Sequence, residues 1–235
     1  MLYPLNRIID QTMLKPHSTW EELERFCIEA IRYNFICVAL LPNVIQEASK
    51  ILGGSEVHIM AAISYPRGMT PLEIKRKEIE EALEDGANEI DMVLNLEAIK
   101  ACEYKLIESE LMTLRKTTGS ITAKAILETT LLDDEEIVRV CQMASDAGID
   151  FVKTSTGFDG NHATIHAVQL MKKSVSNKTK VKAAGGINNL SKVIQMLQAG
   201  AARIGTSSGP KIVEEYRASG ISLDTILNPE DGSLS

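Results

Sequence analysis

The residues most suited to chemistry lie in the stretch 151–157, where Phe151 and Val152 lead directly into Lys153, three hydroxyl residues and a glycine. An unpaired ammonium group is costly to bury, so a lysine at the end of a short apolar strand is unusual. The same burial lowers the pKa of an amine, and a neutral amine can attack a carbonyl carbon to form a Schiff base. For a lysine taken alone, a side chain that reaches past the strand end into solvent is the more common explanation. Whether Lys153 is a nucleophile or a solvent-exposed lysine therefore depends on the other charged residues of the chain.

Two charged residues elsewhere interrupt apolar segments in the same way: Asp91 lies within 89–94 and Lys182 within 180–184. Charged side chains are seldom fully buried unless they are paired. Because side chains alternate along a strand, all three residues could face the interior of a barrel. There the like charges of two lysines would lower at least one lysine pKa, and Asp91 could offset part of the repulsion and handle protons. An internal ion pair between Asp91 and one lysine is the structural alternative, but the second lysine, left over from such a pair, favours catalysis.

We expect the positive charge of Lys182, rather than burial, to be the main cause of a lowered Lys153 pKa. Thr154, Thr156 and Ser207 would line the same barrel mouth and make it polar. Desolvation alone is too weak in polar surroundings to shift a pKa far.

Around these residues the chain alternates short apolar segments with amphipathic ones. Strands are expected at 7–10, 35–40, 57–63, 89–94, 121–127, 151–154, 180–184 and 203–205. Helices are expected after an N-cap at Ser18 or Thr19, and at 42–51, 71–85, 96–117, 133–147, 162–174, 190–199 and 210–219. Strands alternating with helices in this way predict a parallel α/β architecture.

A recurring pattern favours closure of these strands into a TIM (β/α)8 barrel. Gly86, Gly148 and Gly200 each end an expected helix, and a short turn then leads into a strand. These glycines precede every second expected strand, those at 89–94, 151–154 and 203–205, as a regular repeat of strand–helix units would require. Any doubly wound sheet can show such glycines, but no G-x-G-x-x-G motif lies near the first strand, which disfavours the dinucleotide-binding form of that alternative. Residues 1–235 are therefore expected to form a single barrel domain, with a loose tail from about residue 228.

Two glycine-containing loops follow the last two expected strands. Gly185 and Gly186 come after the seventh strand, and the eighth ends in Gly205, followed by Ser207 and Ser208 just before a helix. Barrels commonly bind phosphate at these two loops, through backbone N–H groups and a helix N-terminus. Either loop alone would indicate only a turn, but together they predict a phosphorylated substrate.

Composition argues against several classes of protein. The formal net charge of −7 disfavours a nucleic-acid-binding protein, which would usually present a basic face. No apolar segment reaches the length of a transmembrane helix, and residues 1–15 lack the apolar region of a signal peptide. We therefore expect a cytoplasmic protein without nucleic-acid or membrane partners.

The cysteines and histidines do not indicate a metal site. No C-x-x-C pair is present, which predicts reduced and mostly packed thiols at Cys27, Cys37, Cys102 and Cys141. His162 and His166 have a spacing that suits a metal, but the sequence places no carboxylate or cysteine near them. We expect no bound metal.

With these features the chain resembles the deoxyribose-phosphate aldolases, a family of class I aldolases. The matching segments run through most of the chain, at 9–12, 86–95, 128–129, 131–136, 151–158, 181–187 and 203–209. The Lys-Thr-Ser-Thr-Gly motif is specific in combination with the later Lys-Ala-Ala-Gly-Gly-Ile. The resemblance implies a TIM barrel that cleaves 2-deoxy-D-ribose 5-phosphate reversibly to acetaldehyde and D-glyceraldehyde 3-phosphate. It also implies a lyase of nucleoside catabolism that needs no metal or other cofactor.

The resemblance also assigns roles to individual residues. Lys153 would form the Schiff base, Lys182 would perturb the Lys153 pKa, and Asp91 would take part in the proton relay through water. Asp10 would have a supporting role near the site. The phosphate would be bound by Gly185, Gly186, Gly205, Ser207 and Ser208, with Thr156 and Gly157 lining the same pocket.

Parts of the expected pocket rim depart from the family pattern. Leu41 stands before a proline where the family usually has Asn, His or Tyr, and Ser64 and Arg67 replace glycine and leucine in the 64–68 segment. Some members end in a tyrosine that can reach the site, whereas the last tyrosine here is Tyr216. The reaction type is therefore a firmer expectation than the substrate. The alternatives are a related barrel aldolase for another phosphorylated sugar and a non-catalytic sugar-phosphate-binding protein, and the sequence leaves a homo-oligomer open.

Overall fold

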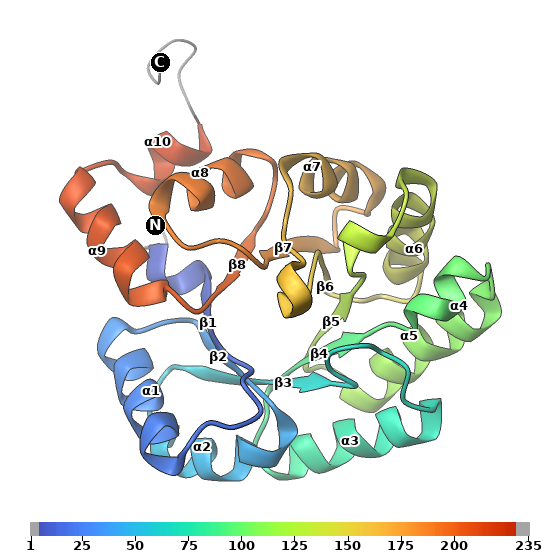
Figure 1. Ribbon diagram of the computed structural model, residues 1–235, viewed down its shortest axis with the longest axis horizontal. Coiled ribbons are helices and arrows are strands. Elements are labelled where there is room, and N and C mark those ends of the chain that lie inside the picture. Colours follow the sequence, from blue (N-terminus) through green and yellow to red (C-terminus); the bar gives the residue numbers. More distant parts are fainter. Residues whose placement is uncertain (1–4, 229–235) are drawn as a thin grey trace.

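Parallel strands close into a barrel in the computed structural model of the protein, which describes residues 5–228 (Figure 1). The strands are β1 (Ile9–Met13), β2 (Cys37–Leu40), β3 (His58–Ile63), β4 (Glu89–Val93), β5 (Thr122–Ile126), β6 (Phe151–Lys153), β7 (Lys180–Ala184) and β8 (Arg203–Thr206). Each strand pairs with the next one in sequence, and β1 pairs with β8 to close the ring. The predicted TIM barrel is confirmed.

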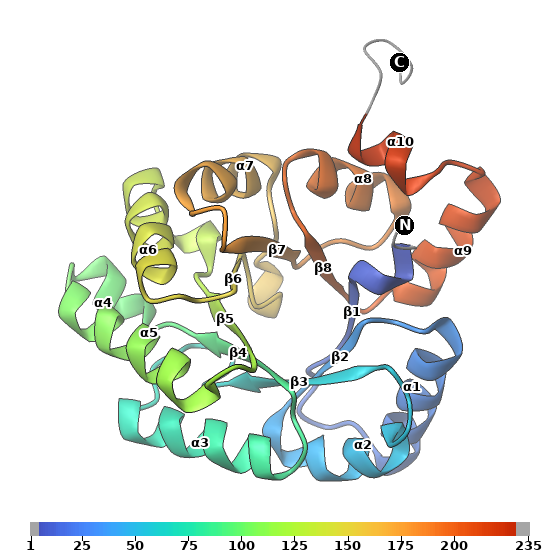
Figure 2. The same cartoon turned by 180° about the vertical axis from the view of Figure 1, so that it is seen from behind.

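Helices surround the strands (Figures 1 and 2). They are α1 (Trp20–Tyr33), α2 (Ile45–Leu52), α3 (Leu72–Glu84), α4 (Leu96–Lys100), α5 (Tyr104–Thr118), α6 (Asp134–Asp146), α7 (Ile165–Ser174), α8 (Leu190–Gln198), α9 (Gly209–Ser219) and α10 (Leu223–Leu227). Short 3₁₀ helices occupy Leu5–Ile8, Pro42–Val44, Thr129–Leu131 and Phe158–Gly160. The sequence does not predict α10.

Local chemistry explains where several of these elements begin and end. Thr19 is the N-cap of α1, and its side chain and that of Glu22 each accept a hydrogen bond from the other residue's backbone N–H. The helix expected at 96–117 is in fact two helices, α4 and α5, because the chain turns at Cys102, whose φ is +58°. The first strand begins at Ile9 rather than at residue 7, because Leu5–Ile8 forms a 3₁₀ helix.

Two separate apolar clusters pack against the strands of the barrel. The space between strands and helices is filled by one large apolar cluster, to which both barrel and helices contribute. A second, smaller cluster consists of Cys37, Ala39, Met60 and Ala62 on β2 and β3. The interior of a TIM barrel is usually filled with branched apolar side chains. Here the remaining strands direct charged side chains to the inside, and these define the site.

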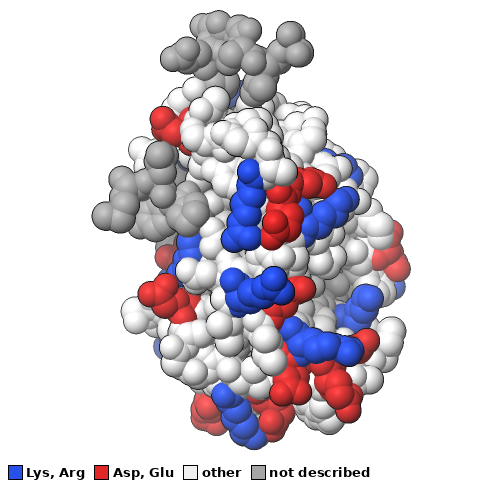
Figure 3. Space-filling view, turned by 90° about the vertical axis from the view of Figure 1, so that its left-hand side faces the viewer, with Lys and Arg blue, Asp and Glu red and all other residues white. Residues whose placement is uncertain are grey.

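No helix within residues 5–228 is long and apolar enough to cross a membrane. On the face that Figure 3 shows, basic and acidic side chains are interspersed. The loose tail expected from about residue 228 lies, from residue 229 onward, outside the described residues.

Candidate active site

Three carboxylates and four basic groups meet inside the barrel, and each of these residues is at most 6% exposed. Contacts between strands that are not neighbours show that they face the interior: Lys182 on β7 contacts both Asp91 on β4 and Asp10 on β1. We call this set the interior network. Its members are Asp10, Glu89, Asp91, Lys124, Lys153, Lys182 and Arg203.

Asp91 lies at the centre of the interior network. Its Oδ2 accepts hydrogen bonds from Lys153 Nζ at 3.0 Å and from Lys182 Nζ at 2.8 Å, and its Oδ1 lies 2.9 Å from Lys124 Nζ. Burial alone would raise the pKa of Asp91, but the charges of the lysines, that of Lys124 first, hold this pKa well below its usual range. The structure therefore brings together the three residues predicted to act, around an ionised carboxylate. Asp91 is not consumed by a pair with one lysine, as the structural alternative required.

Lys153 is the last residue of β6 and is 2% exposed. Burial first, and the neighbouring charge of Lys182 second, together lower the pKa of Lys153 to about 8 against the opposing effect of Asp91. The expectation that like charge would be the main cause is wrong, because burial has the larger effect. Thr154 explains part of the error: it is fully buried and exchanges hydrogen bonds with the backbone of Ala184 instead of lining the mouth.

A cavity of about 1190 Å³ opens at the carboxyl ends of the strands. Lys153 lies in its wall, whereas Asp10, Asp91 and Lys182 are fully buried and do not line it. The residues predicted to bind substrate all line this cavity, namely Thr156, Gly157, Gly185, Gly186, Gly205, Ser207 and Ser208. The nucleophile candidate and the predicted phosphate loops therefore share one chamber.

Close packing explains why glycine stands at two of these positions. A Cβ on Gly205 would lie 2.9 Å from Ala184 Cβ and 3.3 Å from Lys182 Cε, so glycine leaves room for the lysine stem. Gly185 has a φ of +90°, and a Cβ there would lie 2.5 Å from the Asn161 carbonyl oxygen. With α9 beginning at Gly209, directly after the cavity residues, the loops offer backbone N–H groups and a helix N-terminus to an anion.

The positions that depart from the family pattern differ in how close they lie to the cavity. Leu41 lines the cavity directly. Ser64 and Arg67 are not part of the lining among the described residues, but Arg67 lies over the ring of Phe158, 5.8 Å from its centroid. Tyr65 donates a hydrogen bond of 3.4 Å to the carbonyl oxygen of Thr156. The loops after β3 and β6 thus meet across the mouth of the barrel.

Four buried charged residues near the site are missing from the sequence-based prediction. Glu89, Lys124 and Arg203 belong to the interior network. Lys124 interrupts an apolar strand just as Asp91 and Lys182 do, so the same signal could have found it, whereas Glu89 and Arg203 are the first residues of β4 and β8. The fourth, Glu128, follows β5 with a φ of +60° and accepts hydrogen bonds from the amide and hydroxyl of Thr156. Burial raises the pKa of Glu128.

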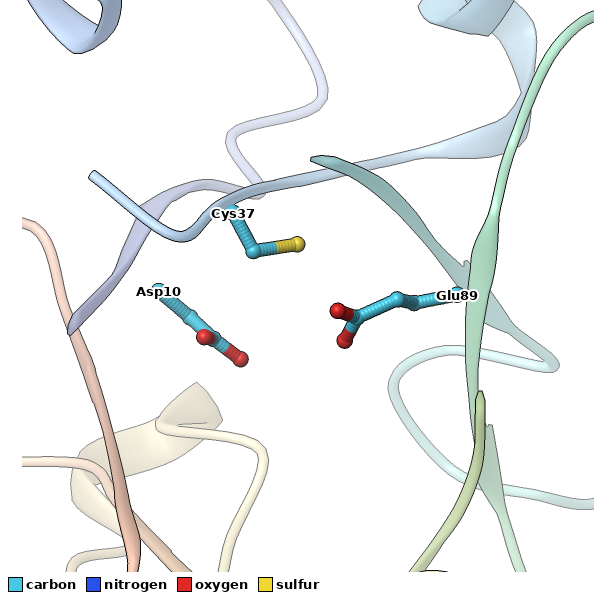
Figure 4. Close-up of side chains that lie close together, drawn as sticks. All are labelled: Asp10, Cys37 and Glu89. Atoms are coloured by element: carbon cyan, nitrogen blue, oxygen red, sulfur yellow. The ribbon is translucent and has the colours of Figure 1, made fainter. Parts of the chain in front are cut away.

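One group of side chains has the composition of a metal site but is already paired with basic groups. Asp10, Cys37 and Glu89 point toward one another inside the barrel (Figure 4). Arg203 Nε donates to Asp10 at 2.7 Å, and Lys124 Nζ lies 2.5 Å from Glu89. Burial raises the pKa of the Cys37 thiol well above its usual range, and a protonated thiol is a poor ligand. The cluster therefore fits an ion-paired network better than a metal.

The cysteines agree with expectation, whereas one histidine differs from it. All four cysteines are free, and all except Cys102 are buried. His166 does have a carboxylate partner, contrary to expectation, because its Nε2 lies 2.8 Å from Asp134 Oδ1. Both side chains are well exposed, so the contact is a surface pair.

Comparison with known proteins agrees with this geometry. The family model described as DeoC/LacD family aldolase matches residues 6–215. The deoxyribose-phosphate aldolase of Thermococcus kodakarensis is 45% identical over 212 residues, which cover 88% of this chain and 95% of that protein. The one from Brevibacillus brevis is 39% identical over 216 residues, covering 92% of this chain and 98% of that protein.

The solved structures include a tetrameric deoxyribose phosphate aldolase from Aeropyrum pernix. It aligns with a TM-score of 0.83 and 31% identity over 92% of each chain. Sequence, fold and the arrangement of buried lysines thus lead to the same assignment. The chain belongs to the DeoC/LacD family of aldolases, which are lyases that act on carbon–carbon bonds.

Proposed function

We propose that the protein is a class I aldolase that cleaves 2-deoxy-D-ribose 5-phosphate reversibly to acetaldehyde and D-glyceraldehyde 3-phosphate, through a Schiff base on Lys153. One observation carries this proposal: a lysine amine in the wall of the cavity has its pKa lowered to about 8. At pH 7 about a tenth of such amines are neutral, against well under a thousandth for an ordinary lysine. No metal or other cofactor takes part.

The amine of Lys153 would attack C1 of the open-chain sugar, and loss of water would give an iminium ion. The iminium withdraws electrons from the C2–C3 bond while the C3 hydroxyl gives up its proton. Glyceraldehyde 3-phosphate leaves, the enamine is protonated at C2, and hydrolysis releases acetaldehyde and the free lysine. Each step moves a proton near Lys153, so a proton carrier must stand beside it.

Asp91 and Lys182 would supply that carrier. Both lysines donate to the same Oδ2 of Asp91, so a proton can pass between their amines by way of this oxygen or of a water molecule beside it. Asp10 contacts Lys182 from the other side and supports its positive charge. The phosphate would occupy the loops formed by Gly185, Gly186, Gly205, Ser207 and Ser208, with Thr156 and Gly157 on the same wall.

The test combines turnover with trapping. The protein is incubated with 2-deoxy-D-ribose 5-phosphate, acetaldehyde is measured, and a parallel sample is reduced with borohydride and digested for mass spectrometry. We expect acetaldehyde release and a stable adduct on the peptide that contains Lys153. Faster cleavage of another phosphorylated sugar would show that the protein is an aldolase with a different substrate. Tight binding without any adduct would establish a non-catalytic sugar-phosphate-binding protein instead.

We expect replacement of Ser207 by aspartate to raise the KM for the phosphorylated substrate by about tenfold or more, because like charges repel in a partly desolvated loop. The unphosphorylated sugar should be affected much less. Ser207→Asn, which has almost the same shape without the charge, is the matched control. Steady-state kinetics on both sugars provide the measurement, and an equal loss for both would make the loop structural.

We also propose that the chain forms a homo-oligomer. The tetrameric relative from Aeropyrum pernix supports this proposal. Light scattering coupled to size exclusion would measure the mass directly, and a mass of 25.8 kDa, that of one chain, would contradict it.

A further inference from the structure

The charges of the interior network do not balance. Among the described residues it contains three carboxylates, those of Asp10, Glu89 and Asp91, and four basic groups. Direct contacts connect them: Glu89 to Lys124 at 2.5 Å, Lys124 to Asp91 at 2.9 Å, and Asp91 to Lys182 and Lys153 at 2.8 and 3.0 Å. Arg203 joins Asp10 to Glu89 at the other end. Six charges cancel, and one cation is left without a counter-ion.

Lys153 is the group that can remove this excess. A net charge in a low-dielectric interior is costly, and a titratable group responds by becoming neutral. Of the network residues described, Lys153 lines the cavity, so its proton can leave to water. Lys124 and Arg203 are held differently: burial would lower the pKa of each, but their carboxylate neighbours outweigh it and raise both pKa values.

We propose that the charge count of the interior network sets how readily Lys153 gives up its proton, and that Glu89 and Lys124 act as positioning residues through it. Glu89 is the first residue of β4, at the end of the barrel away from the cavity, and Lys124 is fully buried between Glu89 and Asp91. Neither touches the cavity in the described structure. The inference rests on the proposed function, because it concerns the amine assigned there as the nucleophile.

Other titratable groups near the network do not enter the count. Burial keeps the Cys37 thiol on β2 neutral by raising its pKa. The side chain of His58 on β3 is half exposed, with its Nδ1 2.8 Å from Glu89 Oε1, so His58 lies at the solvent edge of the network rather than inside it. Glu128 forms no ion pair with a network member in the described structure, and its hydrogen bonds come from the amide and hydroxyl of Thr156. The charge of Lys153 also acts on Glu128, but burial has the larger effect and raises the pKa of this carboxyl, which favours its neutral form. The count therefore comes from the seven members alone.

The count predicts opposite shifts for two substitutions that leave the cavity wall intact. Lys124→Met leaves three carboxylates and three basic groups, so Lys153 should keep its proton and titrate at least about one pH unit higher. Glu89→Gln leaves two carboxylates and four basic groups, so Lys153 should titrate about one pH unit lower. The wild-type midpoint is expected near pH 8. A merely structural role would not produce opposite signs.

The measurement is the pH dependence of acetylation of Lys153 by acetic anhydride, read by mass spectrometry of the peptide that contains it. This titration needs no aldolase activity. If no sugar is cleaved and no aldehyde is trapped, the proposed function fails while the midpoints still test the charge count. Normal cleavage with unmoved midpoints overturns the charge count alone.

A second buried ion pair provides the matched control. Lys75 on α3 and Glu110 on α5 lie 2.5 Å apart, outside the barrel, and are as buried as Lys124 and Glu89. Lys75→Met and Glu110→Gln should lower stability but leave the Lys153 midpoint unchanged. Arg203→Met, which should raise the midpoint, replaces Lys124→Met if that variant does not fold. Shifts of the same sign in the Lys124 and Glu89 variants, or in the control pair, would overturn the proposal.

Discussion

Lys153→Met is expected to reduce cleavage by roughly 10⁴-fold or more and to abolish borohydride-trapped adducts, because the covalent route needs this amine. Methionine fills nearly the same volume, so the barrel should be retained, as circular dichroism would check. Lys180→Met is the matched control, since Lys180 lies on the same sheet but is exposed. An adduct found on Lys182 in the wild-type protein would reverse the roles of the two lysines.

The same variant should be more stable at neutral pH. The pKa of Lys153 is about 8 in the folded protein, below its ordinary value of 10.5 in an unfolded chain. Folding therefore releases a proton between these two pH values, and the contribution of Lys153 to stability improves as the pH rises through that window. At pH 7 the variant should gain roughly 1–3 kcal/mol in the free energy of unfolding. Denaturant unfolding at pH 7 and pH 10 would measure whether the gain shrinks.

Lys182→Met is expected to move the pH profile of adduct formation to higher pH and to reduce cleavage at pH 7 by about 10²-fold or more. Two effects act in the same direction: a like charge beside Lys153 disappears, and Asp91 loses a competing donor. Because burial is the larger cause of the lowered pKa, the midpoint should move only part of the way from about 8 toward 10.5.

Stopped-flow measurement of adduct formation across pH would check this, with Lys180→Met again as the control for loss of one surface charge. Activity that recovers as the pH is raised would support electrostatic activation by Lys182. A profile that overlays the wild type at reduced height would instead make Lys182 a group that transfers protons.

Much of the architecture follows from local patterns in the sequence. Glycines such as Gly86 and Gly148 end helices before strands, and the fold repeats this unit around the barrel. The break at Cys102 could not be predicted, because neither glycine nor proline marks it. The sequence places Thr154 at the mouth, but in the structure its hydroxyl bonds to the backbone of Ala184 instead. Side-chain direction alternates with every residue, so it depends on where the strand ends.

The site shows the same limit more clearly. The charges of Lys153 and Lys182 stand out in the sequence because they end or interrupt apolar segments. The sequence does not show which charges pair with one another, because Asp91 and Lys182 are 91 residues apart and meet only across the closed barrel. The balance between burial and repulsion at Lys153 depends on that packing. A single sequence could thus identify the reacting groups but not rank the causes that tune them.

The ion pair between Asp10 and Arg203 has a consequence for how the chain folds. It joins residues 193 positions apart, on the first and last strands, so it can form only when β8 docks against β1. Before β8 docks, Asp10 and Glu89 are not paired with Arg203. Because unpaired charges are costly to bury, the interior of the incomplete barrel must stay hydrated. Long-range closure is also slow because of the chain entropy it costs. We therefore expect drying of the interior to coincide with docking of the last strand, and pulse-labelled hydrogen exchange should show amides of β1 and β8 becoming protected together, after those of β3 to β5.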